Sequence, residues 1–371
     1  MLRAMKRIAA LLAFSCLCHT LSAQASLAEL EQRFRAEVRQ LASSQPSRAQ
    51  RDQQLDRHVD ELRAFVRDAA RGDDRWNGRL MLADLELVRG NRDAAAAALA
   101  AIDRDEAPAM VLVTAATMAQ HVGLKELRDG LVEAAGTRDA PLEDRMAMAR
   151  LLMTVLREVE RGEQIFRAAL ADARDDEQRA LVRWHQADAL RDREDLPENA
   201  GFEALEALAE ELPKTYWGSV AKDRLRATRL RPGDAAIPFT TRTLKGSPWS
   251  LTAHTGEAVV LAFWTAADYD TPRLVSTLKA LRQQHEGLAV LAVCLDRDKA
   301  EIQRAVETLG VDFEVVGDGK GPQTDVALRW FVEGPVVHVV DKAGRVTALG
   351  LNVGTNDGRE ELADAVARAV K

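Results

Sequence analysis

The stretch AVVLAFWTAADYDTP, residues 258–272, holds two elements that decide the fold of the C-terminal part of the chain. Its first seven residues are apolar and rich in valine and aromatic side chains, a pattern typical of a strand buried on both faces. Thr271-Pro272 then fits a helix start, with threonine as the N-cap and proline in the first turn. The stretch therefore predicts a buried strand, a short loop and a helix.

Further apolar runs and helical patterns alternate on the C-terminal side of this stretch. We expect strands at residues 258–263, 287–295, 336–340 and 345–349, and helices at residues 271–285, 299–309 and 359–370. This alternation indicates an α/β sheet that is covered on both faces. Only the turn Asp341–Gly344 joins the last two strands, which is too short for a crossover, so that pair is expected to be antiparallel.

The region from about residue 27 to residue 229 has a helical pattern, because apolar residues recur every three or four positions. Ala107-Pro108 recurs as Ala140-Pro141, 33 residues later, and a period near 34 is typical of tetratricopeptide-type repeats. In one repeat we expect Gly90 to close the turn between two helices and Pro108 to end the second. Residues 150–173 form another unit, with Gly162 between its helices. A non-repeating helical bundle is the alternative.

The two patterns meet at the Pro232-Gly233 step, which is typical of a domain boundary. We therefore expect a multidomain chain, with an all-α helical-hairpin (TPR-like) region at residues 26–230 and an α/β domain at residues 233–371. Stacked hairpins offer a surface to a protein or peptide partner. A simple spacer that carries the C-terminal domain is the other interpretation.

Residues 1–25 are interpreted as a secretory signal peptide. Three basic residues precede a mostly apolar run at residues 8–18, too short to span a bilayer, and Ala23-Gln24-Ala25 supplies a small-x-small cleavage pattern. We expect export to the periplasm or cell envelope, with no transmembrane segment in the mature chain; a lipoprotein attached through Cys16 is the minor alternative. The mature chain then keeps only Cys294 and cannot form an internal disulfide.

Composition restricts the class of partner. The net charge is −7 and the arginines are scattered, so no basic patch marks a nucleic-acid site. We expect no nucleic acid as a partner, and no cofactor.

The order of features in residues 233–371 resembles the thioredoxin fold, in particular thioredoxin-like domains of the TlpA and redoxin (alkyl hydroperoxide reductase–thiol specific antioxidant) kind. The similarity is carried by the opening Gly233–Phe239, the hairpin Gly246–Leu251, the strand Val259–Trp264 and the segment Gly334–Arg345. The resemblance implies a thiol-disulfide oxidoreductase or peroxidase, in which a C-x-x-C pair follows Phe-Trp at the N-terminus of a helix.

This chain departs from that pattern. Counting from Phe263-Trp264 places the two cysteine positions at Asp268 and Thr271. A thiolate at a helix N-terminus is a nucleophile that can be oxidised and resolved, whereas a carboxylate accepts the same N–H groups but has no such oxidation state. We therefore predict no catalytic residues at these degenerate positions.

The resemblance also implies a groove for an extended peptide, lined by Trp264, Asp268, Tyr269, Asp270, Gly334 and Pro335. Within it, Pro335 would be the family's cis-proline, although the approach from Trp330 is one residue shorter than usual.

Two functions remain open from the sequence. The first is a redox-inactive thioredoxin-like protein that binds or scaffolds in the envelope, for which we expect no enzyme activity. The alternative is a thiol-disulfide oxidoreductase or peroxiredoxin-like antioxidant protein that uses Cys294 or a partner's thiol. Cys294 stands in an apolar run, which favours a buried, unreactive thiol. Asp268 and Asp270 with His254 or His338 are the one candidate set of metal ligands, but carboxylates one residue apart are common in turns, so no metal is predicted.

Overall fold

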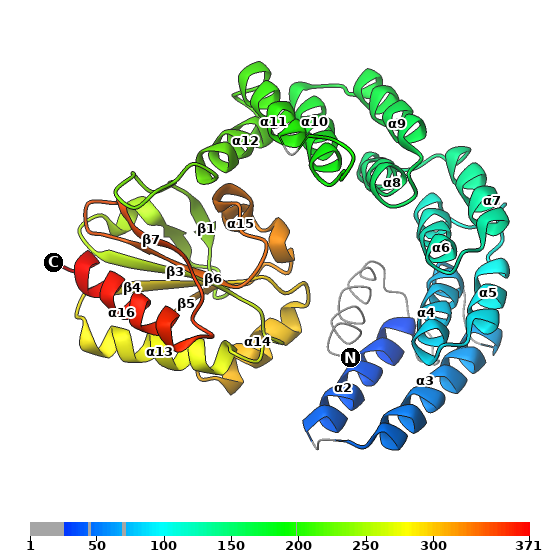
Figure 1. The fold of residues 1–371 in the computed structure, drawn as a ribbon, viewed down its shortest axis with the longest axis horizontal. Coiled ribbons are helices and arrows are strands. Elements are labelled where there is room, and N and C mark those ends of the chain that lie inside the picture. Colours follow the sequence, from blue (N-terminus) through cyan, green and yellow to red (C-terminus); the bar gives the residue numbers. More distant parts are fainter. Residues whose placement is uncertain (1–25, 44–45, 69–71, 198) are drawn as a thin grey trace. The chain divides into compact units, whose positions relative to one another are not determined.

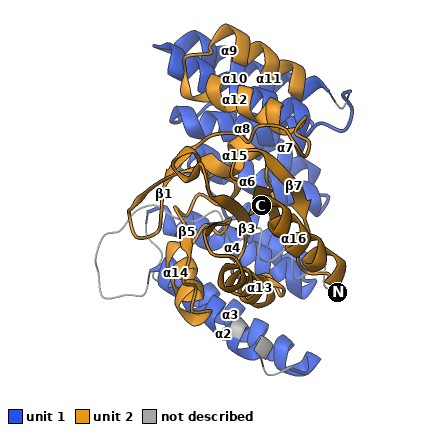
Figure 2. Cartoon of the chain, turned by 90° about the vertical axis from the view of Figure 1, so that its left-hand side faces the viewer, with its two compact units in different colours: residues 1–201 blue, residues 202–371 orange. Residues whose placement is uncertain are grey.

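The computed structural model describes residues 26–43, 46–68, 72–197 and 199–371. The predicted signal peptide, with Cys16, lies outside these residues. The chain separates into two compact units, residues 1–201 and residues 202–371, coloured blue and orange in Figure 2. The predicted boundary at Pro232-Gly233 lies inside the second unit. The last helix before that boundary therefore belongs to the same compact unit as the C-terminal part. The functional division at residues 230–233 stays a prediction.

Unit 1 is built from helices that stand side by side in sequence order (Figure 1). They are α2 (Leu27–Ser43), α3 (Arg48–Asp68), α4 (Asp74–Arg89), α5 (Arg92–Ala100), α6 (Ala109–His121), α7 (Lys125–Gly136), α8 (Leu142–Thr154), α9 (Val159–Asp172), α10 (Asp176–Arg191) and the first residues of α11 (Ala200–Glu211). Three antiparallel hairpins, α4–α5, α6–α7 and α8–α9, are the closest pairs, and α6 also packs on α4 and α8. The predicted stack of helical hairpins is therefore present.

Two details of the predicted repeat are wrong. Pro108 and Pro141 do not end helices; each stands at the N-cap of the next one, α6 and α8, where the missing N–H costs nothing. Gly162 is not a turn residue either, because it is buried inside α9. A methyl group at position 162 would overlap Met153 and the Ala149 carbonyl, so this glycine lets α9 pack closely on α8.

Unit 2 begins in α11 and continues through α12 (Tyr216–Ala227) into an α/β domain. Its strands are β1 (Thr240–Arg242), β2 (Pro248–Ser250), β3 (Ala258–Trp264), β4 (Leu288–Cys294), β5 (Glu314–Val316), β6 (Val336–Val340) and β7 (Val346–Leu351). Its further helices are α13 (Thr271–Gln284), α14 (Lys299–Thr308), α15 (Asp325–Trp330) and α16 (Asn356–Ala369), with short 3₁₀ turns η2 (Leu251–His254) and η3 (Gly321–Gln323).

The main sheet has the strand order β5-β4-β3-β6-β7. Strand β3 lies at its centre, parallel to β4 and antiparallel to β6, and the last pair β6–β7 is antiparallel as predicted. The sequence patterns missed β5 and α15, which are only three and six residues long.

Helices cover both faces of this sheet (Figure 1). Apolar residues of α13, α14 and α16 pack on one face, including Leu278, Ile302 and Leu362. On the other face, Trp330 of α15 packs with Phe263 of β3. All seven residues of β3 are buried, as the opening stretch predicted for a strand covered on both faces.

Candidate functional site

Asp268, in the loop after β3, and Thr271, the first residue of α13, are the two predicted degenerate cysteine positions. The N–H of Thr271 donates to the Asp268 carbonyl at 3.2 Å, so the two residues stand at the ends of one turn. The Asp268 carboxylate accepts the N–H of Asp270 at 2.8 Å, and the Thr271 hydroxyl donates to the Thr265 carbonyl at 2.7 Å. The oxygen atoms of both side chains therefore stabilise the loop itself.

Helix α13 begins at Thr271, so its N-cap, Asp270, lies one residue earlier than the predicted N-cap Thr271. Asp270 occupies the N-cap position, without a side-chain cap hydrogen bond, and Pro272 lies in the first turn. The Asp270 carboxylate instead accepts from Arg273 at 3.0 Å. It also lies against Gly354, where an added Cβ would be 2.6 Å from an Asp270 oxygen. Thr271 is thus not the cap, because its hydroxyl already bonds to the loop.

The sheet register places two of the predicted groove residues opposite each other at the end of β3. Phe263 pairs with Val336, so the next residues along, Trp264 and Pro335, lie opposite each other. The Trp264 side chain is buried, whereas Tyr269 is 88% exposed, the highest value among the exposed large hydrophobic side chains of the described residues. The described chain contains no cis peptide bond, so the bond before Pro335 is trans, unlike the cis-proline that the resemblance implies.

Cys294 lies next to this loop, and its side chain is buried from solvent. Cys294 pairs with Trp264 across β3 and β4, and it is 1% exposed. Its thiol donates to Asp296 at 3.0 Å, and the same carboxylate oxygen accepts the N–H of Ala266 at 2.6 Å. Burial, followed by the nearby Asp296 charge, raises the pKa of the Cys294 thiol far above its usual range. Both effects oppose formation of the nucleophilic thiolate.

Cys294 is therefore expected to resist thiol reagents in the native protein. In a chain that begins at Ser26, Cys294 is the only cysteine. We expect Ellman's reagent at pH 8 to label it at least about 100-fold more slowly than in guanidinium chloride, because the native thiol is protonated and inaccessible. Equal rates in the two conditions would contradict the burial described above.

The histidines considered as metal ligands are placed elsewhere. His254 bonds to Glu257 at 2.7 Å, away from the loop. His338 is buried, its Nδ1 accepts the N–H of Gly350 at 2.9 Å, and its ring stacks on Trp330. Among the residues that the structure describes, no group of three or more His, Cys, Asp or Glu side chains is arranged to hold a metal ion.

The burial of His338 predicts a pH dependence of stability. Desolvation lowers the pKa of His338 from 6.5 to about 4, so the unfolded state binds more protons between these two values and stability falls as the pH is lowered through that window. The full contribution is about 3 kcal/mol. We expect His338→Asn, which keeps an acceptor for Gly350, to lose less stability than the wild type between pH 7.5 and pH 4.5 in urea unfolding. Parallel losses in both proteins would exclude His338 as the cause.

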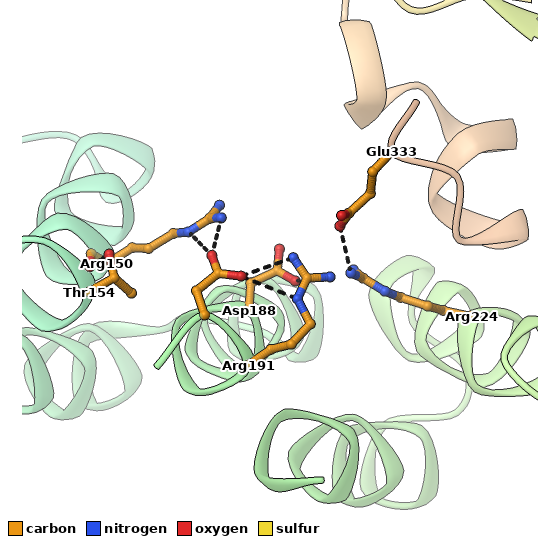
Figure 3. Close-up of polar contacts among 7 residues, drawn as sticks. Arg150, Thr154, Asp188, Arg191, Arg224 and Glu333 are labelled. Atoms are coloured by element: carbon orange, nitrogen blue, oxygen red, sulfur yellow. Dashed lines mark hydrogen bonds and ion pairs between the residues drawn. The ribbon is translucent and has the colours of Figure 1, made fainter. Parts of the chain in front are cut away.

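Unit 1 contains a polar cluster and a groove of its own. Arg150 of α8 bonds to Asp192, which also bonds to Arg191. Asp188 forms an ion pair with Arg191 at 3.6 Å, and Figure 3 shows Arg150, Asp188 and Arg191 close together. Burial raises the pKa of the Asp188 carboxyl, although Arg191 opposes the shift. Separately, a groove of about 590 Å³ lies between α7, α8 and α9, with Met148 and Ile165 at its apolar part and Arg161 at its rim.

Comparison with known proteins identifies the C-terminal part. Residues 232–349, about a third of the chain, match the AhpC/TSA family. The thioredoxin-like protein YneN of Bacillus subtilis is 23% identical over 150 residues, which cover 39% of this chain and 85% of YneN. The thiol-disulfide oxidoreductase ResA of Geobacillus thermodenitrificans is 28% identical over 123 residues, 32% of this chain and 68% of ResA. A crystal structure of a putative thiol:disulfide interchange protein DsbE from Chlorobium tepidum matches with 24% identity, a TM-score of 0.34 and coverage of 38% of this chain and 99% of that one.

The family match and the sheet together confirm the predicted thioredoxin-like domain behind a helical region. The chain is similar to thiol-disulfide oxidoreductases over this part. As for membrane insertion, no helix within the described ranges is both long enough and apolar enough to cross a bilayer.

Proposed function

We propose that this protein is an exported, redox-inactive member of the thioredoxin-like group that binds an extended peptide segment of a partner in the cell envelope. The observation that carries the proposal is the β3–α13 loop. Where the resemblance implies two thiols, Asp268 and Thr271 use their oxygen atoms to hold the loop together. The remaining cysteine, Cys294, is buried and hydrogen-bonded to Asp296.

Tyr269 and Pro335, which are both exposed, support binding without covalent chemistry, while the predicted groove residue Trp264 is buried. An exposed tyrosine supplies a large, rigid contact surface together with a hydroxyl, which is why tyrosine is enriched at binding sites. The loop that carries Tyr269 is held by two hydrogen bonds. The N–H of Ala266 donates to Asp296, and the Thr271 hydroxyl donates to the Thr265 carbonyl. Because the loop is already held in one conformation, binding there costs little additional backbone entropy.

Binding to a cysteine-blocked polypeptide tests the proposal. The probe is fluorescent insulin B chain whose cysteines are alkylated with iodoacetamide, so no disulfide exchange takes place. We expect saturable binding to the wild type and at least fivefold weaker binding to Tyr269→Ala, which is exposed enough to leave the fold intact. Absence of saturable binding would contradict the proposal.

Arg161→Ala, at the rim of the groove in unit 1, is the matched control and should leave binding unchanged. If Arg161→Ala weakens binding and Tyr269→Ala does not, the helical array is the part that binds the probe.

A further inference from the structure

The segment Phe331–Pro335 leads directly into the proposed groove and begins in an unusual conformation. Phe331 ends α15 with a φ of 53° and a ψ of 51°. This is the left-handed region, which residues other than glycine rarely adopt unless their surroundings hold them there. The N–H groups of Phe331 and Val332 close the helix by bonding to the Leu328 and Ala327 carbonyls.

Two helices that precede the family match surround the Phe331 ring. Phe202 of α11 meets it edge-on, with ring centroids 6.0 Å apart, and the guanidinium of Arg224 of α12 lies 4.5 Å from its centroid. Both geometries are favourable for an aromatic ring, whose face is negative and whose edge is positive. The left-handed residue is therefore held from outside the α/β domain.

Arg224 holds the same segment a second time through charge. Its side chain is 4% exposed, and its guanidinium forms an ion pair with the carboxylate of Glu333 at 3.7 Å. Figure 3 shows the two side chains pointing toward each other from α12 and the segment after α15. Glu333 is followed immediately by Gly334 and Pro335, so this ion pair lies one residue from the groove.

Hydrogen bonds and an ion pair between α12 and α15 hold α12 in place, so that Arg224 faces this segment. Arg329 of α15 bonds to Ser219 at 3.0 Å and to Asp223, and Tyr216 donates to Asp325 at 2.7 Å. Tyr216, Ser219 and Asp223 are spaced three and four residues apart and lie on one face of α12. The helix is thus attached to α15 at several points along its length.

We propose that Arg224 is a positioning residue for the peptide groove and that the binding module extends over residues 202–371 rather than beginning at the family match. The proposal rests on the proposed function at one point only, the use of Pro335 and its neighbours as one wall of the groove. Arg224 does not contact the peptide; it fixes the conformation of residues 331–333, which lead directly into the groove residues Gly334 and Pro335.

Hydrogen–deuterium exchange on the full mature chain tests this without any ligand. Glu333→Gln, at an exposed position, should speed exchange of the amides of residues 332–334 and 336 about threefold. Arg224→Met should speed it tenfold or more, and Arg224→Lys, which keeps the charge, should recover most of the protection. The double variant should exchange no faster than Arg224→Met alone, because both changes remove the same interaction. Glu206→Gln, which removes a different exposed ion pair, with Arg229, is the matched control and should leave these amides unchanged.

The alkylated insulin B chain supplies the second reading. Arg224→Met should weaken its binding at least threefold while Arg224→Lys and Glu206→Gln do not. Exchange that is unchanged in Arg224→Met, or that rises evenly across residues 202–371, would overturn the positioning role. If the wild type binds no probe but Arg224→Met still raises exchange locally, the positioning role is supported and the proposed function is refuted.

Discussion

Asp268→Cys combined with Thr271→Cys is expected to give this protein a disulfide and a measurable rate of insulin reduction, whereas we expect no such activity from the wild type. The two positions are the ends of one hydrogen-bonded turn at the start of a 14-residue helix. The helix N-terminus favours a thiolate there, as it does in C-x-x-C proteins. Thiol counting before and after mild oxidation measures the disulfide, and turbidity of precipitating insulin measures the activity.

Each single variant is the control for this experiment. Asp268→Cys alone can form only mixed disulfides, and Thr271→Cys alone places its thiol at a buried position. Neither should turn over, because release of a mixed disulfide needs the second thiol. A double variant whose cysteines stay reduced under oxidising conditions would show that the loop does not have the geometry assigned to it.

A fragment of residues 202–371 is expected to be more stable than a fragment of residues 233–371 by about 3 kcal/mol or more. Deleting α11 and α12 removes Asp223 and Ser219 from Arg329, whose side chain is 15% exposed and is left with Asp325 alone. Breaking a buried ion pair costs about 3–5 kcal/mol when the remaining charge stays buried, and the loss here lies at the lower end because Arg329 keeps Asp325 and gains access to water. The deletion also uncovers the part of the domain core against which Ala227 of α12 and Leu230 pack.

Thermal unfolding followed by circular dichroism compares the two fragments, with a difference in Tm of about 10 °C expected for domains of this size. A third fragment, residues 202–371 with Arg329→Met, separates the ion pairs from the apolar contacts. Equal midpoints for the fragments that begin at residues 202 and 233 would show that α12 is a separate element attached to an autonomous domain.

Much of the C-terminal fold follows from local pattern. The apolar run of seven residues in β3 is long enough to identify a buried strand. The assignment of the two cysteine positions to Asp268 and Thr271, by counting from Phe263-Trp264, stays a prediction. By contrast, β5 and α15 are too short for their periodicity to be distinguished from that of a loop. The wrong prediction that Pro108 ends a helix has a similar origin, because proline is compatible with both the end of one helix and the start of the next.

The contacts that shape the site could not be predicted because they join distant residues. Asp296 was visible as a carboxylate two residues after Cys294, but its bond to Ala266 depends on the parallel pairing of β3 and β4. Arg224 lies more than 100 positions before Phe331 and Glu333 and carried no signal of its own in the sequence.

The central claim is that this thioredoxin-like domain performs no thiol chemistry. The most direct measurement is the rate of insulin disulfide reduction with dithiothreitol by the mature protein and by Cys294→Ser. The account predicts that both proteins give the rate of buffer alone. A rate above buffer that disappears in Cys294→Ser would contradict it, and would restore the alternative of an oxidoreductase that uses Cys294.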